Sequence, residues 1–271
     1  MGAHGERPLT VPSGSGGSAM ASIKEILTCI GVDTSQNTSV LVDLFGFARG
    51  QVPTDPEPGV AAEVSVLQQV RGVQGQHIHL NVIRVGFDLI AAADADEAVE
   101  KLDYAIYRIR NIYRQVDLGV GRVEHFEITS ADANGRDDLG SLDEADELSD
   151  EFTIDNSGID VFVVRNISDP SFVGVSPRPG SCDKGSGQDG LIGGEINREF
   201  ERVARTFAHE VGHFLNLPHN HGGDPDCPDT DSGKNNLMAQ TRCALSIRDS
   251  VLLISGQGNT MRGHCSVQDG C

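Results

Sequence analysis

The sequence contains no tryptophan and only 3 tyrosines, and it has few basic residues, 21 against 40 acidic ones. The resulting formal net charge of −19 repels phosphate backbones and anionic lipids, so nucleic acid is not expected as a partner. No apolar run approaches the roughly 18 residues that a membrane-spanning helix needs, so no membrane span is expected. With 32 glycines, the chain is predicted to be globular and rich in turns and loops.

The 6 cysteines include no Cys-x-x-Cys pair, which argues against a cysteine zinc site. Their even number indicates disulfides and an oxidising destination, with reduced, buried thiols as the alternative. The start of the chain lacks the basic segment and apolar core of a signal peptide. We therefore expect a secreted or extracellular protein whose export route is unclear, or one made in the cytoplasm and delivered from there.

Composition divides the chain into three parts. Residues 1–21 are rich in Gly and Ser and predict a flexible leader. Residues 22–75 contain short apolar stretches and then three prolines between Pro53 and Pro58, which prevent regular structure there. This part is predicted to be a pro-segment or a docking segment, with a small lobe as the alternative. Residues 76–271 carry the regular hydrophobic patterns and every motif discussed below.

Periodicity in the third part predicts one long helix and several strands. The helix begins near Asp94 and Asp96 and ends near Val116, because apolar residues recur there in steps of three and four. Alternating patterns and short apolar runs predict strands at 77–85, 122–129, 159–165 and, at a sheet edge, 191–196. This order predicts an α/β or α+β fold, a sheet with helices packed on it.

An acidic stretch lies between the second and third predicted strands. Within it, Asp132 to Asp137 alternates oxygen-bearing side chains beside a glycine, a weak similarity to a calcium loop. The full twelve-residue signature is missing. A solvated acidic loop is the favoured interpretation, and binding of Ca²⁺ is the alternative.

The strongest motif is His209-Glu210-x-x-His213. In a helix, the two histidines lie one turn apart, about 40° around the axis, so both imidazoles can reach one metal ion. Apolar residues recur on the opposite side of the same helix: Phe200, Val203, Phe207, Val211 and Phe214. This division predicts a helix that buries one face in the core and turns its metal-binding face towards a cleft.

A catalytic zinc site usually has three protein ligands, so a third must come from beyond the helix. His219 can reach the metal only if the chain turns sharply after His213. Asn216 enters the left-handed conformation readily, and Pro218 disfavours helical backbone at the residue before it. The spacing therefore favours His219 as the third ligand, with His221 as the alternative.

These residues predict a chemistry. Three histidines leave zinc one position for water, whose pKa zinc lowers to about 7. Glu210 follows His209 directly and is the candidate general base that takes the proton of that water. The sequence therefore predicts a zinc-dependent endopeptidase that hydrolyses peptide bonds of a protein or peptide substrate.

The segment from His209 to His219 resembles the metzincin motif HExxHxxGxxH, with Asn216 in place of the family's glycine. The segment that contains Met238, Asn-Asn-Leu-Met-Ala, resembles the metzincin Met-turn. The local sequence HEVGHFLNLPH is most similar to that of pappalysin-like and related bacterial metzincins. The resemblance covers roughly residues 77–256 and implies that residues 76–271 are the catalytic domain. It also implies a mostly parallel, twisted mixed sheet, an active-site helix and an irregular C-terminal subdomain ending in a helix at 244–255.

The resemblance also bears on the substrate and on regulation. It implies that an extended peptide lies along the edge strand, on Leu191, Ile192, Gly193 and Gly194, through main-chain hydrogen bonds. No tyrosine follows Met238, so a tyrosine metal ligand is not available. A cysteine holds some metzincins latent, and Cys29 is a candidate, although an ordinary buried or paired cysteine is favoured.

Two alternatives to a conventionally secreted enzyme follow from the same residues. An effector or toxin protease delivered by dedicated machinery would have the same chemistry. A zinc-bearing binding module without turnover is the other alternative, and the presence of Glu210 argues against it.

Overall fold

The computed structural model describes residues 11–12, 18–19, 75–185, 189–220 and 227–269. The chain forms two compact units, one of Met1–Gln74 with Gly270–Cys271 and the other of Gly75–Asp269. In the first unit the described residues form one antiparallel pair, β1 (Val11–Pro12) with β2 (Ser18–Ala19). Residues 22–74, Cys29 and most of the predicted leader lie outside the described residues, so the predicted domain limits stay predictions.

The second unit is built on a four-stranded sheet in the order β4-β3-β6-β8. Its strands are β3 (His77–Val85), β4 (Gly119–Ile128), β6 (Ile159–Val164) and β8 (Gly190–Glu195). All three pairings are parallel. Among the described residues, antiparallel contacts to this sheet are limited to the bridges Val175–Ile192 and His77–Gln268, so the sheet is mostly parallel, as predicted. The predicted α/β class and the four predicted strands are confirmed.

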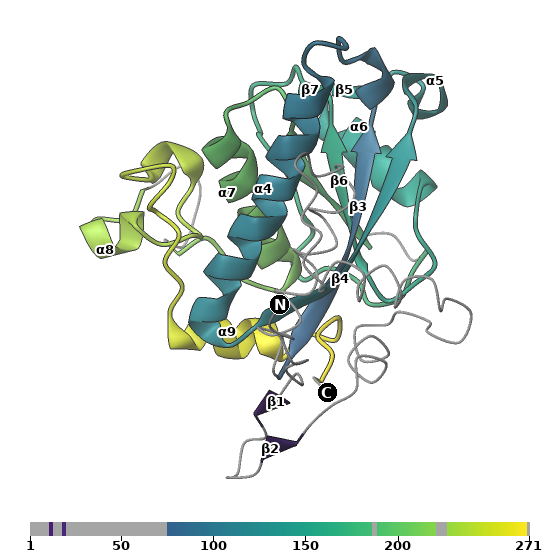
Figure 1. Cartoon of the computed structure of the whole chain (residues 1–271). Coiled ribbons are helices and arrows are strands. Elements are labelled where there is room, and N and C mark those ends of the chain that lie inside the picture. Colours follow the sequence, from purple (N-terminus) through teal and green to yellow (C-terminus); the bar gives the residue numbers. More distant parts are fainter. Residues whose placement is uncertain (1–10, 13–17, 20–74, 186–188, 221–226, 270–271) are drawn as a thin grey trace, which may run out of the picture. The chain divides into compact units, whose positions relative to one another are not determined.

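Helices cover both faces of the sheet (Figure 1). The helices α4 (Ala95–Tyr113) and α7 (Phe200–Phe214) pack on one face, and α6 (Leu142–Glu151) packs on the other. Alternation along β3 serves both layers, because Leu80 and Val82 join the cluster with α4 and α7 whereas Ile83 and Val85 join the cluster with α6. The sheet is therefore buried on both faces, as parallel sheets usually are.

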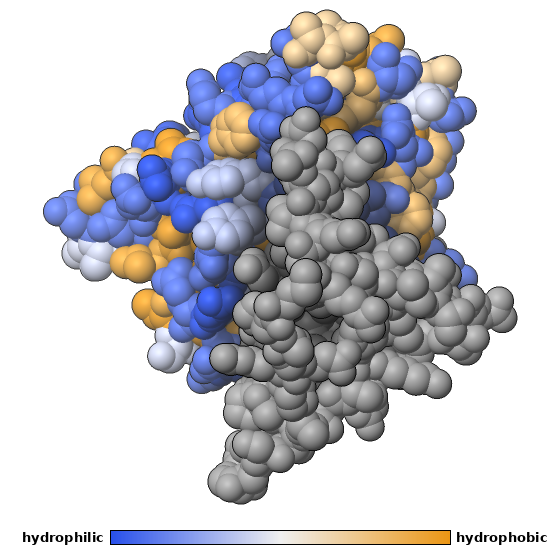
Figure 2. Space-filling model, viewed as in Figure 1, coloured by the Kyte–Doolittle hydropathy of each residue, from blue (hydrophilic) through white to orange (hydrophobic). Residues whose placement is uncertain are grey.

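Short elements complete the second unit. They are η1 (Phe87–Leu89), η2 (Arg114–Val116), α5 (Ser130–Ala133), β5 (Asp138–Leu139), β7 (Asn166–Ile167), α8 (Asp231–Lys234), η3 (Thr241–Cys243) and α9 (Ser255–Arg262). Figure 2 shows a largely hydrophilic surface on this side of the unit, where apolar areas are separated by polar ones. Among the described residues, no helix has both the length and the apolar character needed to cross a bilayer.

Helix α6 forms within the acidic stretch, where the sequence analysis predicted no helix. Its first turn is capped, because Ser141 Oγ accepts a hydrogen bond from Glu144 N (3.2 Å) while Glu144 accepts one from Gly140 N (2.6 Å). Ala145 and Leu148 bury its inner face against the sheet. A serine followed by a glutamate three residues later is a known helix-start pattern, and this signal could have predicted α6.

The predicted C-terminal helix at 244–255 is wrong, because α9 begins only at Ser255. The preceding segment pairs with the chain around Met238 instead. Leu237 N donates to Leu252 O (2.8 Å), and Leu252 N donates to Asn235 O (2.9 Å). These bonds use the main-chain groups of Leu252, which a helix would need for itself.

Two disulfides connect loops of the second unit. Cys182–Cys265 joins the segment before β8 to the C-terminal segment, and Cys227–Cys243 joins the loop before α8 to η3. Disulfides are typical of oxidising compartments, which agrees with the expected extracellular setting.

One buried arginine ties α7 to the C-terminal half of the unit. Arg205, only 2% exposed, donates to Ser250 O (3.0 Å) and to the carbonyls of Leu237 (3.1 Å) and Ala239 (2.6 Å). It also donates to Thr241 Oγ1 (3.2 Å). One side chain thus provides hydrogen-bond donors for three main-chain carbonyls that lie outside helices and strands.

We expect Arg205→Met to lower the free energy of unfolding by about 3 kcal/mol, because it leaves buried carbonyls without donors. Thermal or denaturant unfolding of the metal-free protein measures this change. Arg248→Met is the control, since that side chain is 72% exposed, and it should change stability little. Equal stability of the two variants would contradict the role given to Arg205.

Candidate metal centre

Helix α7 presents two histidines to the same point. His209 and His213 lie one turn apart, with ring centroids separated by 4.6 Å. The Nε2 atom of His219 lies 3.3 Å from Nε2 of His209 and 3.2 Å from Nε2 of His213. The structure thus brings the three predicted metal ligands together, and they form one of two groups of potential ligands found among the described residues.

Main-chain carbonyls orient two of the three rings. His209 Nδ1 lies 2.7 Å from Leu237 O, and His213 Nδ1 lies 2.7 Å from Leu217 O. A carbonyl only accepts, so each Nδ1 carries the proton and each Nε2 has a free lone pair. Burial lowers the pKa of His209 well below its ordinary value and that of His213 to about 4, so both rings are neutral at pH 7.

This arrangement fits a zinc ion. A tetrahedral zinc with Zn–N distances of about 2.0–2.1 Å separates its ligand nitrogens by about 3.3 Å. The two Nε2 contacts to His219 match that separation. The Nε2 atoms of His209 and His213 both lie within 3.3 Å of Nε2 of His219, so one cation between them could accept a lone pair from each of the three rings.

The turn after α7 brings His219 back to the helix. Leu217 N donates to Gly212 O (2.9 Å) and Asn216 N donates to His213 O (2.8 Å), which is the Schellman arrangement. Asn216 has φ of 71°, the left-handed conformation that the sequence analysis expected. The same turn brings Leu217 O to Nδ1 of His213 and so orients that ring. It also redirects the chain so that His219 lies beside the helix. His221, the alternative third ligand, lies outside the described residues.

Met238 packs against α7 at Gly212, the residue before His213. It is fully buried, and a Cβ atom added to Gly212 would lie 2.8 Å from its sulfur. The segment around it forms a tight turn, because Ala239 N donates to Asn236 O (3.1 Å) and Met238 N donates to Asn236 Oδ1 (2.9 Å). Leu237 of this turn supplies the carbonyl that orients His209.

The side chain of Glu210 is 6% exposed, and Gly174 approaches it closely. A Cβ atom added to Gly174 would lie 2.8 Å from both Glu210 Cγ and Thr206 Cγ2. Burial raises the pKa of Glu210 to about 8, against the opposing charge of Arg205. A cation held by the three histidines would lower this pKa again.

The predicted substrate edge is occupied at its centre. Ile192 N donates to Val175 O (2.8 Å), and Val175 N donates to Ile192 O (3.1 Å). All six residues of β8 are buried, including the predicted contacts Leu191, Ile192, Gly193 and Gly194. A further extended segment around Val175 therefore lies outside β8. This segment was not predicted because its apolar residues, Phe172, Val173 and Val175, form only a short run and Pro177 follows closely.

The predicted calcium loop has structural partners. Asp132 Oδ2 accepts a hydrogen bond from Thr129 Oγ1 (2.7 Å), and Asp137 accepts one from Arg165 (2.7 Å). Neither potential metal-ligand group among the described residues includes this loop. The structure therefore gives the calcium alternative no support.

The sequence was compared with known families, curated proteins and solved structures. A family model described as Metallo-peptidase family M12B Reprolysin-like matches residues 93–220, a range that ends just after His219. No curated protein matches the chain.

Two solved structures are similar at 14% identity. One is archaemetzincin from Methanopyrus kandleri, with a TM-score of 0.40 over 68% of this chain and 94% of that one. The other is a chaperone-substrate complex, with a TM-score of 0.35 over 54% of this chain and 25% of that one. Both TM-scores are low, and neither likeness by itself assigns the fold.

The family match includes α7 with His209 and His213, and it also includes His219. Nε2 of His219 lies at the separation that zinc requires from Nε2 of each helical histidine. The pappalysin-like resemblance within the family stays a prediction. The chain resembles this metallopeptidase family over residues 93–220, just under half of its length, and its three histidines fit a zinc-dependent peptidase site.

Proposed function

We propose that the chain is a zinc endopeptidase in which His209, His213 and His219 hold the ion and Glu210 is the general base. The observation that supports this best is the convergence of three ring nitrogens, two of them fixed by main-chain carbonyls. A zinc ion bound there would polarise the carbonyl of the scissile bond and make a water molecule acidic enough to lose its proton near neutral pH.

Glu210 would take the proton of the attacking water and pass it to the leaving amine. Burial raises the pKa of Glu210, and the charge of a bound zinc ion would lower it again, so that the carboxylate would be ionised and able to accept the proton. Its side chain lies against Thr206 and Gly174, so its position is set by packing. A binding module without turnover would have no use for a buried carboxylate at this position, and Glu210 therefore favours catalysis.

We place the substrate on the segment around Val175 in place of β8. This segment pairs with β8 on one side, and an extended peptide would add to its other side through main-chain hydrogen bonds. Gly174 supports this placement, since its close approach to Glu210 puts the segment beside the general base. Delivery as an effector or toxin stays an alternative setting for the same chemistry.

Glu210→Gln should reduce cleavage of casein or a quenched peptide by about 10²–10⁴-fold, because the amide cannot take up the proton. Its zinc content, measured by atomic emission, should equal that of the wild type. Removal of zinc with a chelator should abolish wild-type cleavage, and added zinc should restore it. Undiminished cleavage by the variant would refute the role of Glu210.

His219→Ala should weaken zinc binding by more than about 100-fold, because it removes a direct ligand, whereas loss of a group that only orients a ligand costs about 10–100-fold. Competition with a chromophoric zinc chelator measures the affinity. His221→Ala is the matched control and should bind zinc as the wild type does. The reverse result would make His221 the third ligand.

Gly174→Ala should lower kcat by about 100-fold while zinc content is unchanged, because the added methyl displaces Glu210 from its productive position. Gly256→Ala is the control, since its Cβ would meet no atom within 4 Å. If Gly174→Ala cleaves as fast as this control, the segment does not lie against the general base.

A further inference from the structure

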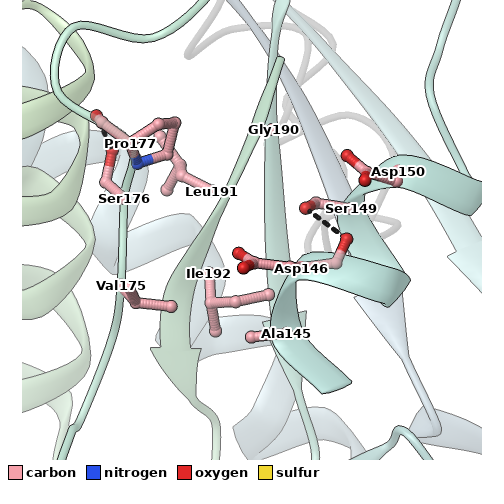
Figure 3. Close-up of a pocket in the computed structure, with 10 residues that line it drawn as sticks. All are labelled: Ala145, Asp146, Ser149, Asp150, Val175, Ser176, Pro177, Gly190, Leu191 and Ile192. Atoms are coloured by element: carbon pink, nitrogen blue, oxygen red, sulfur yellow. Dashed lines mark hydrogen bonds between the residues drawn. The ribbon is translucent and has the colours of Figure 1, made fainter. Parts of the chain in front are cut away.

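A pocket of about 340 Å³ lies on the opposite face of the sheet from α7, between α6 and the segment around Val175 (Figure 3). Helix α6 forms one wall, residues 175–177 form the other, and β8 forms the floor. The lining residues are Ala145, Asp146, Ser149, Asp150, Val175, Ser176, Pro177, Gly190, Leu191 and Ile192.

The pocket combines apolar walls with a negatively charged side. Val175 and Ile192 supply its apolar part, and Figure 3 shows the Asp146 side chain extending from α6 towards β8. Asp150 follows one turn later on the same helix. No ion pair among the described residues involves either carboxylate. Partial burial and the charges of Asp150 and Asp143 raise the pKa of Asp146, which indicates that its negative charge lacks compensation.

The pocket is continuous with the proposed substrate segment. Gly174 faces Glu210 and Thr206 on α7, and successive residues of an extended chain point to opposite sides. Val175 accordingly faces α6 and lines the pocket. At about 3.3 Å per residue, residues 175–177 lie within about three residue lengths of the general base.

We propose that this pocket binds the side chain of a lysine or arginine of the peptide substrate, within about three residues of the scissile bond. The inference rests on the proposed peptidase function and adds a substrate class to it. The aliphatic stem of such a side chain would pack on Val175 and Ile192, and its cationic group would meet Asp146 and Asp150. A neighbouring strand lies about 4.8 Å away, a distance that these long side chains can cross.

Other ligands fit the pocket less well. An anion would meet two carboxylates. A divalent cation needs several oxygen ligands close together, and no group of three acidic or histidine ligands among the described residues lies in this pocket. A purely apolar side chain would leave the carboxylates uncompensated.

A peptide library with each position varied around the scissile bond tests the proposal. The wild type should cleave peptides with Lys or Arg at one position about tenfold faster in kcat/KM than peptides with norleucine or glutamine there. The double variant Asp146→Asn with Asp150→Asn should lose this preference and retain cleavage of the norleucine peptide. Glu147→Gln, on the exposed side of the same helix, is the control and should keep the preference.

A charge reversal sharpens the test. Asp146→Lys should shift the preference at the same position from Lys or Arg towards Glu. Unfolding curves of all variants should match the wild type, because the altered carboxylates are exposed and make no ion pair among the described residues.

The outcomes separate the two proposals. If the zinc-loaded wild type cleaves no peptide or protein, the proposed function fails. If it cleaves without preference for a basic residue, or if the preference survives in the double variant, the function stands and the pocket assignment fails.

Discussion

The site depends on the turn that ends α7. The Schellman hydrogen bonds from Leu217 and Asn216 end the helix at Phe214 and reverse the chain, so that His219 returns to the two helical histidines. Asn216 can take the left-handed conformation at small cost, whereas a β-branched residue there would be strained. Without this turn, His219 would continue along the helix axis, and the three ring nitrogens could not meet.

The turn around Met238 and the side chain of Arg205 hold α7 and its histidines in place. The turn around Met238 supports α7 at Gly212, and its carbonyl at Leu237 orients His209. Arg205 binds the carbonyls of this turn from within α7, so the helix that carries the ligands also fixes the loop that orients them. The metal centre and the C-terminal segment are therefore stabilised by the same set of hydrogen bonds.

The two faces of the sheet carry different parts of the proposed site. The face under α7 carries the histidines and Glu210, and the face under α6 carries the pocket with Asp146 and Asp150. The extended segment around Val175 belongs to both, since Gly174 approaches Glu210 and Val175 lines the pocket. A peptide on this segment could bind through main-chain hydrogen bonds to it. Its side chains, which alternate along a strand, could then determine which peptides bind.

The sequence by itself determined the strands, the long helix α4, the division of faces on α7 and the left-handed Asn216, because each depends on residues close together along the chain. It predicted α7 and its histidines for the same reason. Only the tertiary structure decided what lies beside them: the hydrogen bonds of Arg205, the pairing of Leu252 with the turn around Met238, and the bridge from Val175 to β8. These contacts join residues about 15 to 45 positions apart, and no local pattern specifies such partners. The C-terminal helix was placed too early, because the main chain of Leu252 pairs with the turn around Met238. The sequence placed β8 at the end of the sheet but did not reveal that Val175 pairs with Ile192 there.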